Sequence, residues 1–321
     1  MARRRNPVVQ ALTTAFTVGF IRVGGRIPLA LSRPCAVFVG RVLTLLVPRV
    51  RRVTRENLER AYGDSLGDAE KARICRGAID NVSLVAAEFG HIPRLDSSAL
   101  GRNIEVAGVE LLDPDQGYLC IGAHLGNWEL AAPIMARKGL KIAEVVRPFD
   151  DPRMDRVIDG VRTSNGLTTI PKDNAGKEIT RLLKDGYLVG VLIDQSPRES
   201  AVPVTFFDAP CWATIAPVMI AVRAKVPILP ISVVRRPDYG YTLRFHAPIE
   251  MVRRGNLRED LVVNSQRCQD AVEAVVREHP EQWLWLHRRW KERPRLAEEW
   301  ARKTARDEQK GDAIPAKEDE S

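Results

Sequence analysis

A histidine and a glutamate five residues apart are the strongest candidates for chemistry in this chain. His124 lies three residues after the end of an apolar run, residues 118–121, that is typical of a buried strand, and Glu129 lies where the next helix is expected to begin. An imidazole titrates near neutral pH and can take a proton from a hydroxyl group when a carboxylate fixes its tautomer. Because five residues turn through about 140° on a helix, the two side chains can meet only if His124 lies in the loop and Glu129 in the first helical turn.

A second polar pair ends another apolar run. Asp194 and Gln195 close the stretch 188–193, whose residues are apolar or glycine up to that point. In open α/β sheets the carboxyl ends of neighbouring strands carry the chemistry, so Asp194 competes with Glu129 for the role of orienting the His124 ring. The sequence leaves both possibilities open.

Two arginines supply permanent positive charge in the same half of the chain. Arg162 lies at the end of a predicted helix, where its guanidinium suits a phosphate group or a developing oxyanion. Arg147, directly before Pro148, is either a second phosphate contact or a salt-bridged structural residue, and the two interpretations carry equal weight. Asn127 and Gln195 are the polar neighbours expected to contact substrate.

Three other patterns are set aside. Residues 63–67 match the Gly-x-Ser-x-Gly pattern of a hydrolase nucleophile elbow, but a polar helix precedes Ser65 where that elbow needs a buried strand. No histidine accompanies Asp150, Asp151 and Asp155, so we expect a solvated turn there and no metal site. The five cysteines lack metal or redox spacing, as in a reduced protein, and we expect no cofactor.

Short β-rich runs alternate with helical periods from residue 104 onward. This alternation predicts an α/β fold with a mostly parallel sheet flanked by helices. The predicted strands are 118–121, 142–146, 167–170, 188–193, 202–206, 228–234 and 242–245. The predicted helices of this half are 128–138, 153–164, 175–185, 214–224 and 256–278, and helical spacing at 51–62 and 68–91 predicts two more before it.

The first 55 residues carry eleven arginines and no acidic residue, whereas the rest of the chain is slightly acidic. Two apolar runs, 8–21 and 35–47, lie in this basic segment, and each is shorter than the roughly 20 residues that span a bilayer. Helices lying in the membrane interface fit this combination best, and buried core helices are the alternative. A cleaved signal peptide and a nucleic-acid-binding arm are disfavoured.

Composition divides the chain into three parts. We expect residues 1–50 to form a membrane-associated helical segment and residues 51–297 to form the catalytic domain. Residues 298–321 are charged and poor in apolar side chains, which predicts a disordered tail.

Several stretches together resemble the lipid A biosynthesis acyltransferases, a family within the wider glycerolipid acyltransferase superfamily. They comprise the Arg-x-x-x-Glu-Asn-Leu-x-x-Ala-Tyr stretch at 52–62, His124 with Glu129, the Arg-Pro and Asp-Gln pairs at 147–148 and 194–195, and Pro-Glu-Gln-x-x-Trp-x-His-Arg-Arg at 280–289. The resemblance runs from about residue 51 to residue 294. One departure is that residues 196–201 lack the glycine that many relatives have in this loop.

The resemblance implies transfer of a fatty acyl chain from an acyl carrier protein or coenzyme A thioester to a hydroxyl group of a membrane glycolipid. The leading acceptor is a lipid A precursor, at the cytosolic face of the inner membrane, with no nucleic-acid partner. Another glycolipid or a lysophospholipid, such as a phosphatidylinositol mannoside, is an alternative, as is a catalytically silent lipid-binding protein. The candidate catalytic residues are His124, Glu129, Asp194 and Arg162, and the candidate substrate-binding residues are Arg147, Asn127 and Gln195.

The resemblance also gives these residues roles. His124 would act as the general base on the acceptor hydroxyl, and no acyl-enzyme is implied because no serine or cysteine nucleophile is evident. Arg162 matches a family position held to be functional. In the closing segment 280–291, we expect a helix that packs its tryptophans inward and directs its cations toward lipid headgroups, in preference to a nucleic-acid site.

Overall fold

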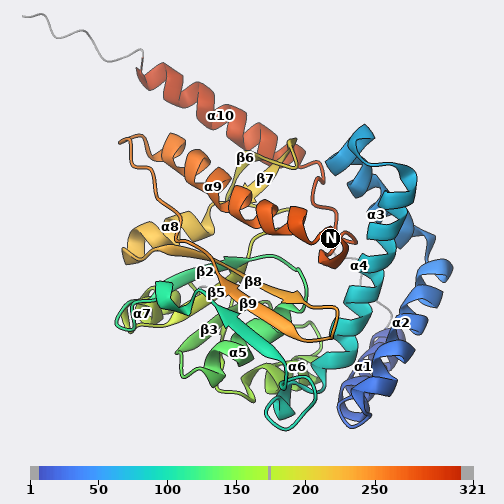
Figure 1. Ribbon diagram of the computed structural model, residues 1–321. Helices are drawn as coiled ribbons and strands as arrows, with labels where there is room; N and C mark the ends of the chain where they lie inside the picture. Colours follow the sequence, from blue (N-terminus) through green and yellow to red (C-terminus); the bar gives the residue numbers. More distant parts are fainter. Residues whose placement is uncertain (1–6, 173–174, 312–321) are drawn as a thin grey trace, which may run out of the picture.

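A seven-stranded sheet forms the centre of the molecule, as the computed structural model shows for residues 7–172 and 175–311 (Figure 1). In these residues the strand order is β1-β9-β8-β2-β5-β3-β4, and every neighbouring pair is parallel except β8 with β9. The strands are β1 (Ile104–Ala107), β2 (Tyr118–Gly122), β3 (Ile142–Val146), β4 (Thr168–Pro171), β5 (Leu188–Leu192), β8 (Ile228–Arg235) and β9 (Tyr241–Phe245). The predicted α/β class with a mostly parallel sheet is confirmed.

Helices cover both faces of this sheet (Figure 1). They are α5 (Ala131–Arg137), α6 (Pro152–Thr163), α7 (Gly176–Lys184), α8 (Ala216–Ala224) and α9 (Leu257–Glu278). Helices α3 (Pro48–Tyr62) and α4 (Asp68–Phe89) pack against each other to the side of the sheet. Side chains alternate along β2, so that Leu119 and Ile121 join the core beneath α7, α8 and α9, whereas Tyr118 and Cys120 join the core beneath α5 and α6. This double burial explains why the parallel strands read as continuous apolar runs.

Two strands escaped prediction. β1 is a four-residue edge strand in which no residue is fully buried, so it lacks an apolar run. β7 (Ala209–Thr214) pairs antiparallel with β6 (Ala201–Phe206) in a separate hairpin, whereas the sequence predicts that a helix begins at its last residue. The sequence of β7 holds a proline and two alanines, which have low strand propensity. We attribute its extended conformation to its pairing with β6.

The N-terminal segment contains two helices of 18 residues, α1 (Pro7–Gly24) and α2 (Leu29–Leu46), beside α4 (Figure 1). By length and composition α2 could cross a membrane, with a mean hydropathy of 1.6, although signal sequences meet the same criterion. Only 11% of this stretch is buried, so α2 is not a core helix. Its exposed side chains include large apolar residues, namely Leu31, Phe38, Leu43, Leu45 and Leu46.

The expected disorder of the C-terminal tail is wrong for residues 298–311. Helix α10 extends over Pro294–Gly311, and Leu296 in its first turn is buried. Trp300 lies under the guanidinium of Arg258 from α9, 3.9 Å from ring centroid to Cζ, and accepts a hydrogen bond from it through its carbonyl oxygen. These contacts with α9 stabilise a charged helix that composition alone does not favour. Residues 312–321 lie outside the described residues.

Candidate active site

His124 and Asp194 leave the sheet side by side. Strands β2 and β5 are parallel neighbours whose last paired residues are Gly122 and Leu192, and His124 and Asp194 each follow two positions later. Nδ1 of His124 lies 2.8 Å from Oδ1 of Asp194, and the backbone N–H of His124 donates to Oδ2 at 2.9 Å. Asp194 therefore contacts both the ring and the backbone of His124. Of the two acids that the sequence leaves open as partners of the ring, Glu129 and Asp194, the structure places Asp194 beside it.

The surroundings of Asp194 keep it ionised. Only 2% of its side chain is exposed, and the indole N–H of Trp283 donates to Oδ2 at 2.8 Å. Burial alone would raise the pKa of this carboxyl, but the charge and hydrogen bonds of His124, together with Trp283, outweigh that effect and hold the pKa at about 2. A carboxylate so stabilised remains an acceptor, which directs the Nδ1 proton of the ring toward it and leaves Nε2 as the basic nitrogen.

Nε2 of His124 points to the accessible side of the pair. It lies 3.4 Å from the side-chain nitrogen of Gln195, and the ring packs edge-on against Trp128 with centroids 5.2 Å apart. Burial lowers the pKa of the imidazole, but the charge and hydrogen bond of Asp194 outweigh it, with help from Glu129 and Glu144, so the pKa lies above its ordinary value. Such a histidine is a competent general base that holds its proton firmly once it has taken it.

Glu129 orients an arginine and not the histidine. Its carboxylate oxygens accept from Nε and Nη2 of Arg162, at 2.9 and 2.7 Å, in a two-point contact. Glu129 lies in the 3-10 helix Trp128–Leu130, at the start of the helical segment, as the sequence predicts. Its side chain nevertheless points to Arg162 in the last turn of α6 and not to His124. The pKa of Arg162, which burial would lower, lies well above its ordinary value because of Glu129.

Glu144, on β3, is a site residue that sequence reasoning missed. It is a half-buried carboxylate in the middle of a sheet strand, and burial together with the neighbouring charge of Glu129 raises its pKa to about 7 against the opposing effects of Arg162 and His124. An acid that interrupts an apolar run was the available signal. The carboxyl groups of Asp194, Glu129 and Glu144, one arginine and one histidine thus form a single group of ionisable side chains at this end of the sheet.

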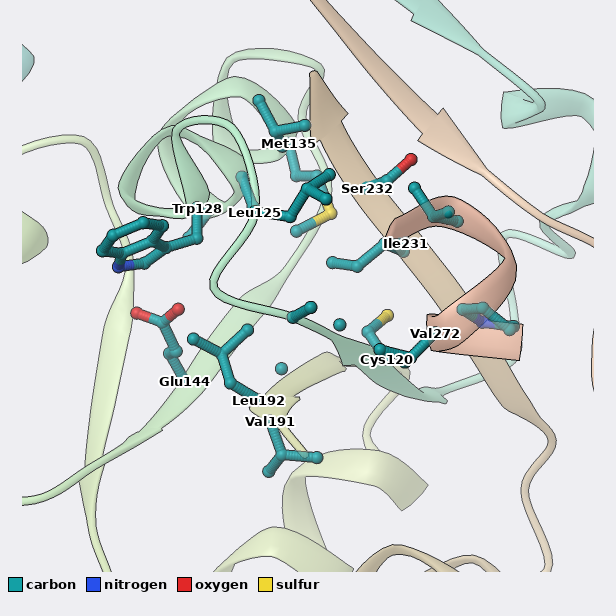
Figure 2. A pocket seen from close by; sticks show the side chains of 18 of the residues that line it. Cys120, Leu125, Trp128, Met135, Glu144, Val191, Leu192, Ile231, Ser232 and Val272 are labelled. Carbon is teal, nitrogen blue, oxygen red and sulfur yellow. The ribbon is translucent and has the colours of Figure 1, made fainter. Parts of the chain in front are cut away.

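An apolar cavity of about 40 Å³ adjoins this group (Figure 2). Figure 2 shows Glu144 and Trp128 on one side of it, Met135 and Leu125 on another, and Ile231 and Val272 opposite. This volume has room for about three water molecules.

The candidate substrate-binding residues separate in the structure. Arg147 is exposed at the end of β3, and Gln195 is exposed beside Nε2 of His124, so both are open to a ligand. Asn127 contradicts its expected role. It is fully buried and donates to Oε2 of Glu88 at 2.8 Å, because its backbone is held against β8 and turns the side chain into the interior.

The closing segment packs as expected in part. Trp283, Trp285 and Trp290 are buried, which confirms the inward tryptophans. The expected helix is wrong beyond the 3-10 turn Pro280–Gln282, and Arg289 is fully buried, where it donates to the carbonyl of Trp212 and to Oε1 of Gln269. The segment leaves helical geometry where its backbone bonds to the His124 loop, since the N–H of Leu284 donates to the carbonyl of His124.

The patterns set aside remain outside the site. Ser65 lies in the 3-10 turn Gly63–Ser65 and donates to the carbonyl of Tyr62. Asp151 accepts from the backbone N–H of Arg153 as the N-cap of α6, and Asp155 accepts from the backbone of Phe149. No group of three histidine, cysteine or acidic side chains suited to a metal occurs in the described part of the chain.

Comparisons with known proteins agree with the sequence pattern. A family model described as bacterial lipid A biosynthesis acyltransferase matches residues 3–292. A lipid A biosynthesis acyltransferase of Haemophilus influenzae is 26% identical over 75% of this chain and 78% of its own length, and the lipid A biosynthesis lauroyltransferase of Escherichia coli is 25% identical over 80% and 84%. The crystal structure of a 1-acyl-sn-glycerophosphate acyltransferase from Thermotoga maritima aligns at 16% identity, over 77% of this chain and 96% of that one, with a TM-score of 0.35.

Proposed function

This chain belongs to the bacterial lipid A biosynthesis acyltransferase family and is an acyltransferase, and we propose that it moves a fatty acyl chain from a thioester to a hydroxyl of a lipid A precursor. The donor is an acyl carrier protein or coenzyme A thioester, and the acceptor lies in the membrane surface. The observation that carries the proposal is the 2.8 Å contact between Nδ1 of His124 and Oδ1 of Asp194, which leaves Nε2 facing Gln195. The residues on either side of His124 in the chain, Ala123 and Leu125, line the apolar cavity.

The reaction needs one proton to move twice. Nε2 of His124 takes the proton of the acceptor hydroxyl as its oxygen attacks the thioester carbonyl carbon, and the carbonyl oxygen becomes an oxyanion. When the oxyanion collapses, the carbon–sulfur bond breaks and the imidazolium returns the proton to the leaving thiolate. Asp194 stabilises the imidazolium between these two transfers, as the carboxylate of a serine protease triad does.

Arg162 supplies the fixed positive charge in this proposal. Glu129 occupies its Nε and Nη2, which holds the guanidinium at one place near the ends of the strands. A preorganised cation is worth most where charge develops in a low-dielectric site, so Arg162 would stabilise the oxyanion or a substrate phosphate. Arg147 and Gln195, both exposed at the same end of the sheet, would contact the polar part of the substrates.

The activity is tested by mass spectrometry of purified protein with acyl carrier protein and coenzyme A thioesters and candidate acceptors. His124→Ala should lower turnover by about 10²–10⁴-fold, the usual contribution of a general base. The matched control is His279→Ala, since that histidine lies at the C-terminal end of α9 and does not line the apolar cavity. Near-normal turnover by His124→Ala would refute the proposed base.

We also propose that residues 1–50 attach the enzyme to the cytosolic face of the inner membrane. The exposed apolar side chains of α2 support this, as do the arginines of the segment, which favour an anionic cytosolic surface. Phe38→Glu with Leu45→Glu should reduce sedimentation with vesicles that contain anionic phospholipid. Leu257→Glu, at an equally exposed position on α9, is the control. Equal binding by both proteins would show that α2 is not the attachment.

A further inference from the structure

Glu88 is a buried carboxylate that the reaction does not use. It lies near the end of α4, fully buried, between two arginines from different parts of the chain. Nε of Arg33, on α2, donates to Oε1 at 2.9 Å, and Nη1 of Arg235, on β8, binds the same oxygen. The hydroxyl of Tyr241 donates to the other oxygen. Charges are placed in a protein interior at a cost, so a carboxylate that accepts from several buried partners constrains the positions of those partners.

The same carboxylate holds the loop that bears His124. The side-chain nitrogen of Asn127 donates to Oε2 of Glu88 at 2.8 Å, and Asn127 is only three residues beyond the histidine. About two helical turns earlier on α4, the side-chain nitrogen of Asn81 donates to the carbonyl of Gly126 at 2.8 Å. Helix α4 therefore binds the end of the His124 loop at two successive residues.

The loop has little freedom to move elsewhere. Gly126 adopts a φ of +58°, and a Cβ atom there would lie 1.8 Å from the carbonyl oxygen of Val233. The backbone N–H of Asn127 donates to that same carbonyl at 3.2 Å. A loop clamped between β8 and α4 transmits a shift of Asn127 directly to His124.

On the other side of Glu88 is the helix that we propose as the membrane attachment. Arg33 reaches Glu88 from α2, and the side chain of this arginine is only 11% exposed. A second arginine of the same helix, Arg41, makes a two-point contact with Asp80 of α4, but that pair is exposed to solvent. Of these two links from α2 to α4, the one through Arg33 alone continues to the His124 loop.

We propose that Glu88 is a positioning residue that couples the seating of α2 to the geometry of the loop bearing His124. When α2 is seated, Arg33 and Arg235 share Oε1 and leave Oε2 aligned for Asn127. When α2 moves away, the carboxylate is free to turn toward Arg235, and the hydrogen bond to Asn127 weakens. The inference rests on the proposed function, because it takes His124 to be the base.

Arg33→Gln tests the coupling from the α2 side while the Glu88–Arg235 pair keeps the cluster charge-balanced. We expect kcat to fall about tenfold with little change in KM, since a small misplacement of a reacting group is costly to the rate. The acidic limb of the kcat/KM profile should move to lower pH, because a His124 ring that spends less time beside Asp194 loses the raised pKa. Arg33→Lys should recover part of the rate.

Arg41→Gln is the matched control, and its kcat and pH profile should stay at the values of the unmodified protein. Hydrogen–deuterium exchange supplies a readout that needs no catalysis: the amides of residues 124–127 should exchange faster in Arg33→Gln but not in Arg41→Gln. Asn127→Ala, which breaks the contact at the loop end, should reproduce the kinetic signature. Combined with Arg33→Gln it should cost little more than either change alone, because both act through Glu88.

Three results would overturn the coupling: equal effects of Arg33→Gln and Arg41→Gln, additive losses in the double variant, or unchanged exchange of the loop in Arg33→Gln. Failure of the proposed function is distinguishable, since His124→Ala would then retain turnover while the exchange measurement still decides whether Arg33 steadies the loop.

Discussion

Two carboxylate–cation pairs, His124–Asp194 and Arg162–Glu129, lie at the same end of the sheet. They differ in whether the cation can release a proton near neutral pH. In the His124–Asp194 pair the cation is an imidazole, which gives up its proton near neutral pH. In the Arg162–Glu129 pair it is a guanidinium, which stays charged, and its pKa lies well above the ordinary value. The exposed fractions of the two cations are nearly equal, 20% and 21%, so access to solvent does not distinguish them. The chemistry of the cation decides which pair can move a proton and which can only hold charge.

The comparison also separates the two acids that compete in the sequence. Asp194 receives three hydrogen bonds, two of them from His124, whereas Glu129 receives two from Arg162 and a longer one from the indole of Trp128. We therefore assign to Asp194 the orientation of the base, and to Glu129 the orientation of the fixed charge.

The largest effect should come from Asp194→Asn. An amide cannot stabilise the imidazolium and permits the wrong tautomer of the ring, so kcat/KM should fall by about 10²–10⁴-fold. The charge of Asp194 raises the pKa of His124, and the base must be deprotonated to work. The unmodified enzyme should thus lose activity as the pH falls through a value above 6.5, and the variant should show this limb at lower pH. Steady-state kinetics against pH measures both quantities.

Glu129→Gln is the matched control for Asp194→Asn, because it changes the other carboxylate in the same way. We expect a smaller loss, about tenfold, from a less firmly held Arg162. A loss as large as that of Asp194→Asn would contradict the division of roles between the pairs.

A loss of about tenfold to a hundredfold, smaller than that of Asp194→Asn, should follow Arg162→Lys, although the charge is unchanged. An ammonium group cannot make the two-point contact with Glu129 and so is less firmly placed. A rise in KM for one substrate alone would indicate phosphate binding, whereas equal falls in kcat and kcat/KM would indicate stabilisation of the oxyanion. Normal turnover of both Arg162→Lys and Arg162→Ala would make Arg162 structural and Arg147 the candidate.

The smallest effect should come from Glu144→Gln, which leaves both pairs intact. The plateau rate should change by no more than about threefold, because Glu144 takes no direct part in the proton transfers. The negative charge of Glu144 contributes to the raised pKa of His124, so its removal should move the acidic limb slightly to lower pH. An unchanged limb would show that the histidine does not sense this carboxylate.

The sequence by itself determined the fold class and much of the site. Apolar runs and helical periods predict the sheet and its covering helices, because a parallel sheet buried on both faces needs continuous apolar strands. Since the carboxyl ends of neighbouring parallel strands meet at one edge, the positions of His124 and Asp194 at the ends of two such runs were enough to make them candidate partners.

Only the tertiary structure decided which polar side chains meet. Glu129 turned to Arg162, Asn127 to Glu88, and Arg289 into the core, and each choice depends on a residue far away in the chain. Glu144 became a site residue because β3 places it beside charges from other elements. Apolar periodicity is a local property that sequence displays, whereas the partner of a buried charge is set by distances that exist only after the strands and helices have packed.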